Sequence, residues 1–408
     1  MKTVWSSISL ASVLLFGGIA GCSAQDAAGD EKGKQTAKEK ENKKTEQEKT
    51  AQEGKKEEKK QAVAPKPKPA PKPKDITVKG VYISGAAAGM DSKFNELTKL
   101  VDDTELNSLV MDVKGDSGEI TYDSNVAQVN SYGSDQHPPI KNIKQRLKVM
   151  KDKNIYTIAR VVTFKDPYMA KKKPEFAMKK KTGGLYYNDG IPWVDPYKEQ
   201  YWAYVTSVAK EAAKLGFDEI QFDYVRFPDN GAQVDREVKF DNPSKKSKAQ
   251  NIHDFLTYAK KELKPYGVNV SADVFGVSTS AKGDTGIGQQ WESLTQAVDV
   301  MSPMTYPSHY GPGEYGIKVP DAEPYKLIKS ALQPAIDRDK VLEKQNKHTA
   351  KIRPWYQDFT ARWVDGHVTY GPQQVKDQIR AGKELGIEGY LLWNASNRYT
   401  KEALQPQN

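Results

Sequence analysis

The chain has 408 residues, with 62 Lys and Arg against 53 Asp and Glu, a hydrophobic content of 37% and a single Cys. The excess positive charge is concentrated, because residues 30–74 contain 15 Lys, no Arg and 9 acidic residues, whereas residues 75–408 hold 46 basic and 43 acidic ones. The Lys-rich segment has no aromatic residue that could stack on bases, so we expect no nucleic-acid partner. A disulfide scaffold is excluded, since one Cys cannot close a loop within the chain.

Residues 1–21 have the pattern of an export signal, in which Lys2 is followed by an apolar run over 8–16 and then by small residues. The run is shorter than the about 20 residues that a membrane span requires, so we expect cleavage. The segment Ile19–Cys22 (Ile-Ala-Gly-Cys) resembles the lipobox of bacterial lipoproteins. This resemblance implies that Cys22 is lipidated and anchors the chain at the extracellular face of the cytoplasmic membrane. The alternative is an ordinary cleaved signal with an incidental Cys.

Residues 22–74 are predicted to form a disordered linker. Lys, Glu, Gln and Ala dominate the segment, which closes on Pro-Lys repeats over 64–74. Such a composition buries too little apolar surface to offset the entropy of folding, and the Pro-Lys part favours extended polyproline II. We interpret the segment as a spacer. The alternative is that its Lys residues contact an anionic lipid or wall polymer.

From residue 75 onward, short β-rich runs alternate with longer helical patterns. Eight strands are predicted, over 78–85, 108–115, 156–164, 219–228, 268–276, 299–307, 351–360 and 389–396. Helices are predicted between them, over 93–102, 140–152, 197–215, 252–264, 291–297, 324–336 and 373–385. Gly216, Gly267 and Gly386 follow helical segments, where a left-handed cap is needed.

Eight β and α pairs in residues 75–408 indicate an α/β fold of the (β/α)8 type, a TIM barrel. A doubly wound open sheet is the runner-up. It is disfavoured because no Gly-x-Gly-x-x-Gly sequence follows the first strand.

Two acidic residues fall late in adjacent predicted strands, at the barrel end where TIM-barrel chemistry occurs. Asp223 lies among apolar residues, so we expect it to be catalytic or to pair with Arg160 or Arg226. Asp273 ends the next strand, with a lesser role as a helix cap or an orienting group as the alternative. Glycoside hydrolysis needs two carboxyl groups, about 5–5.5 Å apart for retention or about 6.5–9.5 Å for inversion. Adjacent strands lie about 4.8 Å apart, which allows both separations.

Other polar and aromatic residues near the strand ends are candidates for sugar binding. Flat rings cover the apolar faces of sugars, while polar neighbours bond the hydroxyl groups. Tyr306, Trp355 and Trp393 are the candidate stacking platforms, and Asp358 is a reserve catalytic acid. The remaining candidates are Asp112, Lys114, Arg160, Arg226, His309 and Gln357, of which Asp112 and Lys114 are predicted to share one face with Asp116.

No metal or cofactor is predicted. The five His residues lack His-Glu-x-x-His spacing, and no Gly-x-Ser-x-Gly elbow indicates a Ser-His-Asp triad. A weaker alternative is a Ca²⁺ or Mg²⁺ site at Asp112 and Asp116, which would make the protein a non-glycosidic, metal-dependent hydrolase.

Five motifs resemble a glycoside hydrolase domain family of unknown function from bacterial cell-envelope proteins, which is itself similar to α-amylase-type barrels. They are Leu109–Tyr122, Phe222–Pro228, Met301–Tyr310, Arg353–Phe359 and Leu392–Ser396. The resemblance implies a nucleophile at Asp223 and an acid on the fifth strand, where amylase-type enzymes have Glu and this chain has Asp273. Residues 218–224 are also similar to the chitinase motif, but Val225 stands where that motif has its Glu. A substrate-assisted mechanism is therefore not expected.

We predict a lipid-anchored, monomeric glycoside hydrolase acting on a polysaccharide, with Asp223 as nucleophile or base and Asp273 as general acid. The alternative is a non-catalytic barrel that binds cell-wall glycan.

Overall fold

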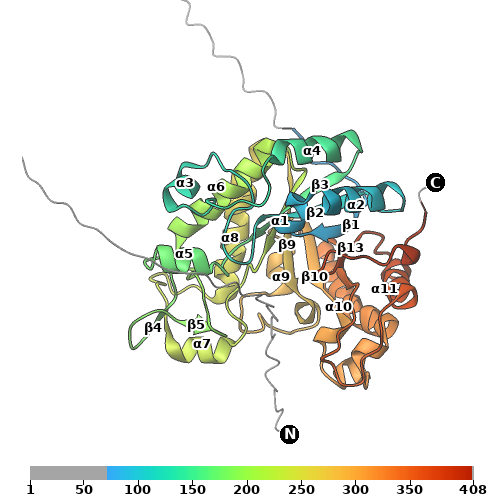
Figure 1. The fold of residues 1–408 in the computed structure, drawn as a ribbon. Coiled ribbons are helices and arrows are strands. Elements are labelled where there is room, and N and C mark those ends of the chain that lie inside the picture. Colours follow the sequence, from blue (N-terminus) through green and yellow to red (C-terminus); the bar gives the residue numbers. More distant parts are fainter. Residues whose placement is uncertain (1–70, 407–408) are drawn as a thin grey trace, which may run out of the picture. The chain divides into compact units, whose positions relative to one another are not determined.

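A closed barrel of eight parallel strands forms the centre of the fold in the computed structural model, which describes residues 71–406 (Figure 1). β13 pairs with β1 and β9 pairs with β10, which closes the ring, and the short β11 also pairs with β10. The predicted TIM barrel is confirmed, because every predicted strand range contains a barrel strand. In barrel order the strands are β1 (Lys79–Ile83), β2 (Ser108–Lys114), β3 (Tyr156–Val162), β7 (Glu219–Asp223), β9 (Asn269–Phe275), β10 (Val300–Met304), β11 with β12 (Lys351–Ile352 and Trp355–Gln357) and β13 (Tyr390–Trp393).

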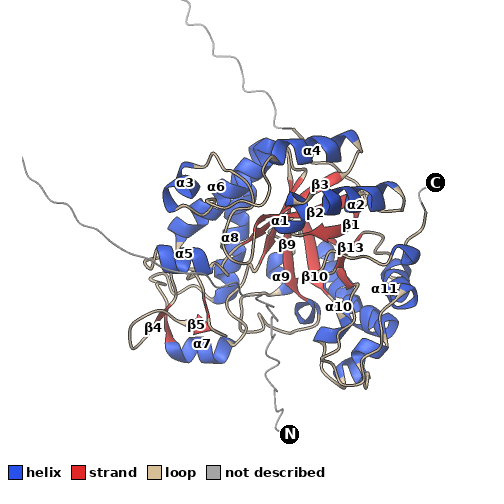
Figure 2. Cartoon of the chain, in the orientation of Figure 1, coloured by secondary structure: helices blue, strands red, loops and turns tan. Residues whose placement is uncertain are grey.

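Helices surround the barrel (Figure 2) and follow the predicted ranges. Each turns an apolar face toward the strands, as the buried Phe255 of α8 does against Phe222 of β7. Gly216, Gly267 and Gly386 have φ angles of 104°, 66° and 80°, which confirms the predicted left-handed caps. The helices are α2 (Asp91–Asp102), α4 (Ile143–Asp152), α6 (Glu199–Leu215), α8 (Lys248–Leu263), α9 (Trp291–Leu294), α10 (Pro324–Lys344) and α11 (Pro372–Glu384).

Shorter elements occupy the connections after the strands. The long loops after β3 and β7 pair with each other through β4 (Lys179–Lys180) and β8 (Val238–Lys239). β5 (Tyr187–Asn188) and β6 (Ile191–Pro192) form a second small antiparallel pair in the loop after β3. Four short helices complete the loops: α1 (Gly85–Gly89), α3 (Ala127–Tyr132), α5 (Pro167–Lys172) and α7 (Gly231–Glu237). The loops after β3 and β7 are thereby tied together beside the end of β7.

Residues 71–78 lead into β1 without regular secondary structure and contact the amino-terminal end of the barrel. Lys74 Nζ lies 2.7 Å from Asp218 Oδ1, and Asn269 Nδ2 donates to the Lys74 carbonyl at 2.9 Å. Asp75 forms an ion pair with Lys351. The last residues of the predicted linker thus lie against the barrel. The predicted signal, Cys22 and linker residues up to 70 lie outside the described residues.

A buried ion pair lies inside the barrel near the amino-terminal ends of the strands. Arg353 Nη1 and Nη2 donate to the Glu219 carboxylate at 3.0 and 2.5 Å. Ser271 Oγ and Tyr156 Oη donate to the same carboxylate at 2.5 and 3.1 Å. Both oxygens of Glu219 are therefore engaged, as a buried charge requires. We call Glu219, Arg353, Ser271 and Tyr156 the floor cluster.

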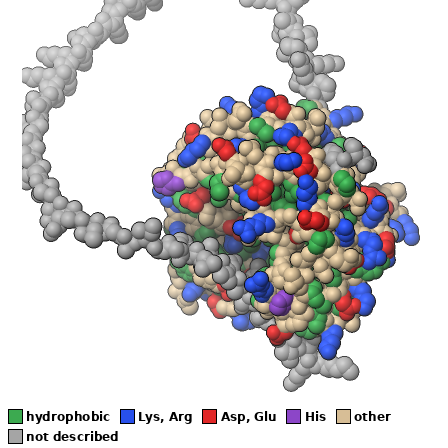
Figure 3. Space-filling view, turned by 45° about the vertical axis from the view of Figure 1, so that its right-hand side comes forward, with side chains coloured by type: hydrophobic (Ala, Val, Ile, Leu, Met, Phe, Trp, Pro, Cys, Tyr) green, Lys and Arg blue, Asp and Glu red, His purple; other side chains and the backbone are tan. Residues whose placement is uncertain are grey.

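The surface carries charges of both signs. Figure 3 shows Lys and Arg side chains interspersed with Asp and Glu over the face in view, in keeping with the near balance of charge in residues 75–408. Within residues 71–406, no helix combines the length and apolar character needed to cross a bilayer.

Candidate active site

Asp223 is the last residue of β7, and Asp273 lies opposite it on the neighbouring β9, two residues before that strand ends. The register pairs Gln221 with Ser271 and Phe222 with Ala272, so the next positions along β7 and β9 are the two carboxylates. Phe222 packs outward among the helices, whereas Gln221 Nε2 donates to Ser302 Oγ inside the barrel. Side chains thus alternate between the two faces of β7 as far as Asp223, where the strand ends.

Arg160 binds Asp223 and two further carboxylates. Its Nε and Nη2 donate to Asp223 Oδ2 at 2.9 and 2.6 Å, and its Nη1 donates to Asp112 Oδ1 at 2.7 Å. Nη2 also donates to Asp116 Oδ1 at 2.9 Å. Burial alone would lower the pKa of Arg160, but the three carboxylates outweigh it and raise that pKa well above its usual value. We call Arg160, Asp112, Asp116 and Asp223 the Arg160 cluster.

The backbone directly after Asp223 fixes the second oxygen of this carboxylate. Tyr224 has a φ of 48°, in the left-handed region that non-glycine residues seldom adopt. This turn brings the Tyr224 N–H to 2.6 Å from Asp223 Oδ1. Strained backbone of this kind concentrates at functional sites and is held in place by its surroundings. Asp223 is therefore oriented on both oxygens, by Arg160 on one side and by its own chain on the other.

Asp273 has a different environment. It is 2% exposed, and its Oδ1 accepts a hydrogen bond from Trp355 Nε1 at 2.7 Å. Burial first, and then the charge of Asp223, raise the pKa of Asp273 well above its usual value, against a smaller opposing effect of the Trp355 hydrogen bond. Two carboxyl groups with contrasting surroundings are the arrangement from which acid and base roles arise.

The three candidate aromatic platforms differ in accessibility. Trp355 is 1% exposed and serves as the hydrogen-bond donor to Asp273, which corrects its predicted role as a stacking surface. Trp393 is partly exposed and stacks on Tyr82, with ring centroids 4.2 Å apart. Tyr82 Oη also donates to Asp112 Oδ2 at 2.6 Å, so this ring links the stack to the Arg160 cluster. The sequence reasoning missed Tyr82, although it lies late in the first predicted strand.

A series of rings leads outward from the site. The ring centroid of Tyr306 lies 6.1 Å from that of Phe359, which is stacked 6.0 Å from Trp363. Tyr306 is buried close to both carboxylates, since their charges contribute to raising its pKa after burial. Trp363 is 68% exposed. We call Tyr306, Phe359 and Trp363 the aromatic ladder. Phe359 lies at the end of the seventh predicted strand and Trp363 lies in the loop after it, and neither was predicted to bind sugar.

Several predicted site residues make contacts that support loops. Lys114 lies 2.8 Å from Asp166 and donates to the Val162 carbonyl, because the register shifts between Asp112 and Lys114. Lys114 therefore does not share the face of Asp112 and Asp116, contrary to the predicted grouping. Asp116 does join Asp112 at Arg160.

Gln357 and Asp358 are likewise occupied by loop contacts. Gln357 Nε2 donates to Asp321 at 3.0 Å, and its Oε1 accepts the N–H of Ser308. Both oxygens of Asp358 accept hydrogen bonds from Thr400, at 2.6 and 2.8 Å. His309, in contrast, is exposed and lies edge-on to Tyr306 with ring centroids 5.2 Å apart.

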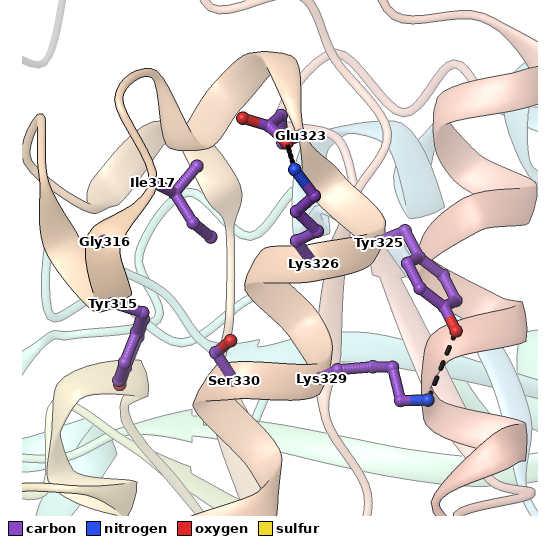
Figure 4. A pocket seen from close by; sticks show the side chains of 8 residues that line it. All are labelled: Tyr315, Gly316, Ile317, Glu323, Tyr325, Lys326, Lys329 and Ser330. Carbon is purple, nitrogen blue, oxygen red and sulfur yellow. Dashed lines mark hydrogen bonds and ion pairs between the residues drawn. The ribbon is translucent and has the colours of Figure 1, made fainter.

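Two cavities lie away from the carboxylates. One, of about 280 Å³, is bounded by Tyr315, Gly316 and Ile317 and by the first turns of α10, where Figure 4 shows Glu323 paired with Lys326 and Tyr325 with Lys329. The other, of about 380 Å³, includes Lys79 and Glu105 at the amino-terminal end of the barrel. Neither is lined by a candidate catalytic residue. Over residues 71–406, no group of three or more His, Cys, Asp or Glu is arranged to hold a metal ion.

The comparison with solved structures finds one that shares this architecture and others with lower similarity. The glycoside hydrolase domain of PgaB (BpsB) from Bordetella bronchiseptica is 13% identical, with a TM-score of 0.56 over 82% of this chain and 100% of that one, which shows a common fold. A hypothetical protein from Ruminiclostridium thermocellum is 40% identical over 48% of this chain and 97% of its own, with a TM-score of 0.44. The spore cortex-lytic enzyme SleL from Bacillus megaterium is 11% identical, covering 84% of this chain and 74% of its own, with a TM-score of 0.47.

Among curated proteins, none matches this chain. The model of one protein family, however, matches residues 80–399, which runs from β1 to the loop after β13 and so includes the whole barrel. The chain therefore belongs to the family described as "DUF4015: Putative glycosyl hydrolase domain".

Proposed function

We propose that this glycosyl hydrolase domain cleaves a polysaccharide with Asp223 and Asp273 as its two catalytic carboxyl groups. The observation that carries the proposal is their position opposite each other on the neighbouring strands β7 and β9, in contrasting surroundings. The raised pKa of Asp273 suits a general acid, which must hold a proton at working pH. Asp223, fixed on both oxygens, suits a nucleophile or base that must be aimed at one atom.

In this mechanism Asp273 gives its proton to the glycosidic oxygen as the bond to the anomeric carbon breaks. Asp223 either attacks that carbon or takes a proton from the attacking water. Tyr306, His309 and Trp393 would contact the sugar rings next to the two carboxylates. Phe359 and Trp363, the outer members of the aromatic ladder, would extend the contact to neighbouring sugars.

The test is a digest of a glycan library, with products analysed by mass spectrometry for the wild type and Asp223→Asn. We expect the substitution to lower the rate at least about 1,000-fold, because the amide neither attacks carbon nor accepts a proton. Asp377→Asn, on the outer face of α11, is the matched control. Full activity of Asp223→Asn on any glycan that the wild type cleaves would refute the assignment. Equal glycan binding by both proteins without any product would instead support a non-catalytic binding barrel.

The role of Asp273 predicts a pH profile. Because the raised pKa keeps the acid protonated, activity should fall as pH rises through that pKa. Asp273→Asn should abolish this alkaline limb, along with most of the activity on substrates whose leaving group needs a proton. An unchanged profile in the variant would assign the acid role to another residue.

We also propose that the chain is anchored to the outer face of the membrane through lipid on Cys22, on the strength of Ile19–Cys22 alone. Metabolic labelling with radioactive palmitate and partition into Triton X-114 test this. The wild type should be labelled and enter the detergent phase, whereas Cys22→Ser should be unlabelled and stay in the aqueous phase. Labelling that persists in Cys22→Ser would refute the proposal.

A further inference from the structure

One of three deeply buried arginines has no acidic partner. Arg160, Arg353 and Arg226 are 2%, 4% and 5% exposed. Arg160 pairs with three carboxylates and Arg353 pairs with Glu219. Arg226 forms no ion pair within residues 71–406, and its one hydrogen bond runs from Nη1 to the Phe227 carbonyl at 2.9 Å. A guanidinium carries five N–H donors, so most of those of Arg226 have no acceptor in the described protein.

Aromatic rings hold this guanidinium in place. Its central carbon lies 4.4 Å from the ring centroid of Phe275, 5.0 Å from that of Trp193 and 5.2 Å from that of Tyr224. The rings come from three different segments, namely the end of β9, the residue after β6 and the turn after β7. Cation–π attraction acts through the ring faces and leaves the N–H groups without hydrogen bonds. We call Phe275, Trp193 and Tyr224 the aromatic cage. The cage orients the guanidinium of Arg226 without neutralising its charge.

The cage lies beside the candidate carboxylates. Phe275 is two residues beyond Asp273 on β9, and Tyr224 follows Asp223 directly. The Nε and Nη2 atoms of Arg226 have no hydrogen-bond partner and are not among the fully enclosed polar atoms that lack one, so they keep contact with solvent. Burial lowers the pKa of Arg226 despite the attraction of Asp229, Tyr224 and Asp223, whereas carboxylates raise the pKa of Arg160 and Arg353. Within residues 71–406, Arg226 is therefore a buried cation that no carboxylate pairs directly, although Asp229 and Asp223 attract it from a greater distance.

We propose that Arg226 binds an oxyanion substituent, a carboxylate or a phosphate, on the sugar bound next to the cleaved bond, so that the substrate is an acidic polysaccharide. This inference rests on the proposed function. An oxyanion supplies both the missing charge and two acceptors that match the guanidinium fork, and a neutral hydroxyl group supplies no charge. A buried cation without a direct ion pair is costly, and a bound acidic ligand would lower this cost.

The test compares paired substrates that share a backbone. One pair is a uronic-acid polysaccharide and its carboxyl-reduced form, and the other is a phosphorylated glycan and its dephosphorylated form. For each pair the readout is the ratio of kcat/KM on the acidic form to that on the neutral form. We expect a wild-type ratio of about 10 to 100 for the pair that carries the natural substituent, the size of effect given by a charge-assisted bond. The responding pair identifies carboxylate or phosphate.

Arg226→Gln should bring this ratio to about one, and Arg226→Lys, which keeps the charge and loses the fork, should give an intermediate ratio. Arg380→Gln, an exposed arginine on α11, is the matched control and should keep the wild-type ratio. Arg226→Lys also keeps the test decisive if Arg226→Gln fails to fold. A wild-type ratio near one for both pairs, or equal ratios in the wild type and Arg226→Lys, would overturn the inference.

Binding measurements separate this inference from the proposed function. If the wild type cleaves no glycan, isothermal titration of the four polysaccharides still reports the preference for the acidic form and its loss in Arg226→Gln. Such a result supports the anion site and contradicts hydrolysis. Cleavage without any preference for the acidic form supports hydrolysis and contradicts the anion site.

Discussion

The two charged clusters inside the barrel differ in how completely their charges are matched. In the floor cluster, one arginine meets one glutamate, and Ser271 and Tyr156 complete the acceptor capacity of Glu219. At the opposite end, Arg160 is shared by three carboxylates, and Asp273 accepts a hydrogen bond from the Trp355 indole. Within residues 71–406, Arg226 forms no ion pair with an acidic residue.

This difference separates a structural cluster from a functional one. In the floor cluster the two charges neutralise each other, so no charge is left for a ligand to match, although Arg353 Nε has no hydrogen-bond partner within residues 71–406. Unmatched groups are costly in the empty protein and are retained where a reaction or a ligand uses them. The amino-terminal end of the barrel therefore contributes mainly to stability, whereas the opposite end of the same strands carries the candidate catalytic groups.

The largest effect on stability should come from breaking the floor cluster. Glu219→Gln leaves the Arg353 charge buried without a counter-ion, so we expect the free energy of unfolding to fall by about 3–5 kcal/mol. Urea unfolding followed by circular dichroism measures it. Asp152→Asn, which removes an exposed pair with Lys148, should change the same quantity by less than about 1 kcal/mol. Equal effects of the two substitutions would remove the distinction between the clusters.

A smaller effect of opposite sign is expected at Asp273. Its pKa is raised in the folded protein above the value of about 3.9 for an unfolded chain, so the folded state binds the proton more tightly. The contribution of this group to stability is complete below pH 4 and is lost as pH rises toward the folded pKa. Asn does not titrate and its carbonyl keeps the Trp355 hydrogen bond. The melting temperature of Asp273→Asn should therefore exceed that of the wild type increasingly between pH 4 and pH 8, and a constant difference would contradict this.

The smallest effect is expected at the tip of the aromatic ladder. Trp363→Ala removes an exposed ring, so unfolding should change by no more than about 0.5 kcal/mol. Affinity for a polymeric substrate should fall roughly 3- to 10-fold, as for one lost stacking contact, while a short oligosaccharide that ends at Tyr306 should bind as before. Val341→Ala on α10, another exposed apolar residue, is the control. Equal loss for both substrate lengths would place Trp363 outside the binding surface.

The barrel could be predicted because its signals are local. Each strand range has its own β-rich run, and Gly216, Gly267 and Gly386 end helices through a backbone preference visible in a single residue. The position of Asp223 late in its β-rich run is a local signal too, since the strand ends at this residue.

The site was less predictable because its contacts join distant segments. The prediction that Lys114 shares a face with Asp112 assumed an unbroken alternation of side chains along the strand. It was wrong because a register shift interrupts the pairing of β2 there. The choice between Arg160 and Arg226 as the partner of Asp223 depends on how β3 lies beside β7, which the sequence of either strand does not contain. Trp193, which packs against Arg226, lies in the long loop after β3 and belongs to none of the sequence motifs, so its contact could not be predicted.

The segment before β1 has a practical consequence for handling the protein. Lys74 and Asp75 fasten the incoming chain to Asp218 and Lys351, beneath the floor cluster and at the far end from the carboxylates. A label or short cross-linker attached at residue 71 therefore lies near the end of the barrel opposite the carboxylates, where it leaves the candidate site uncovered.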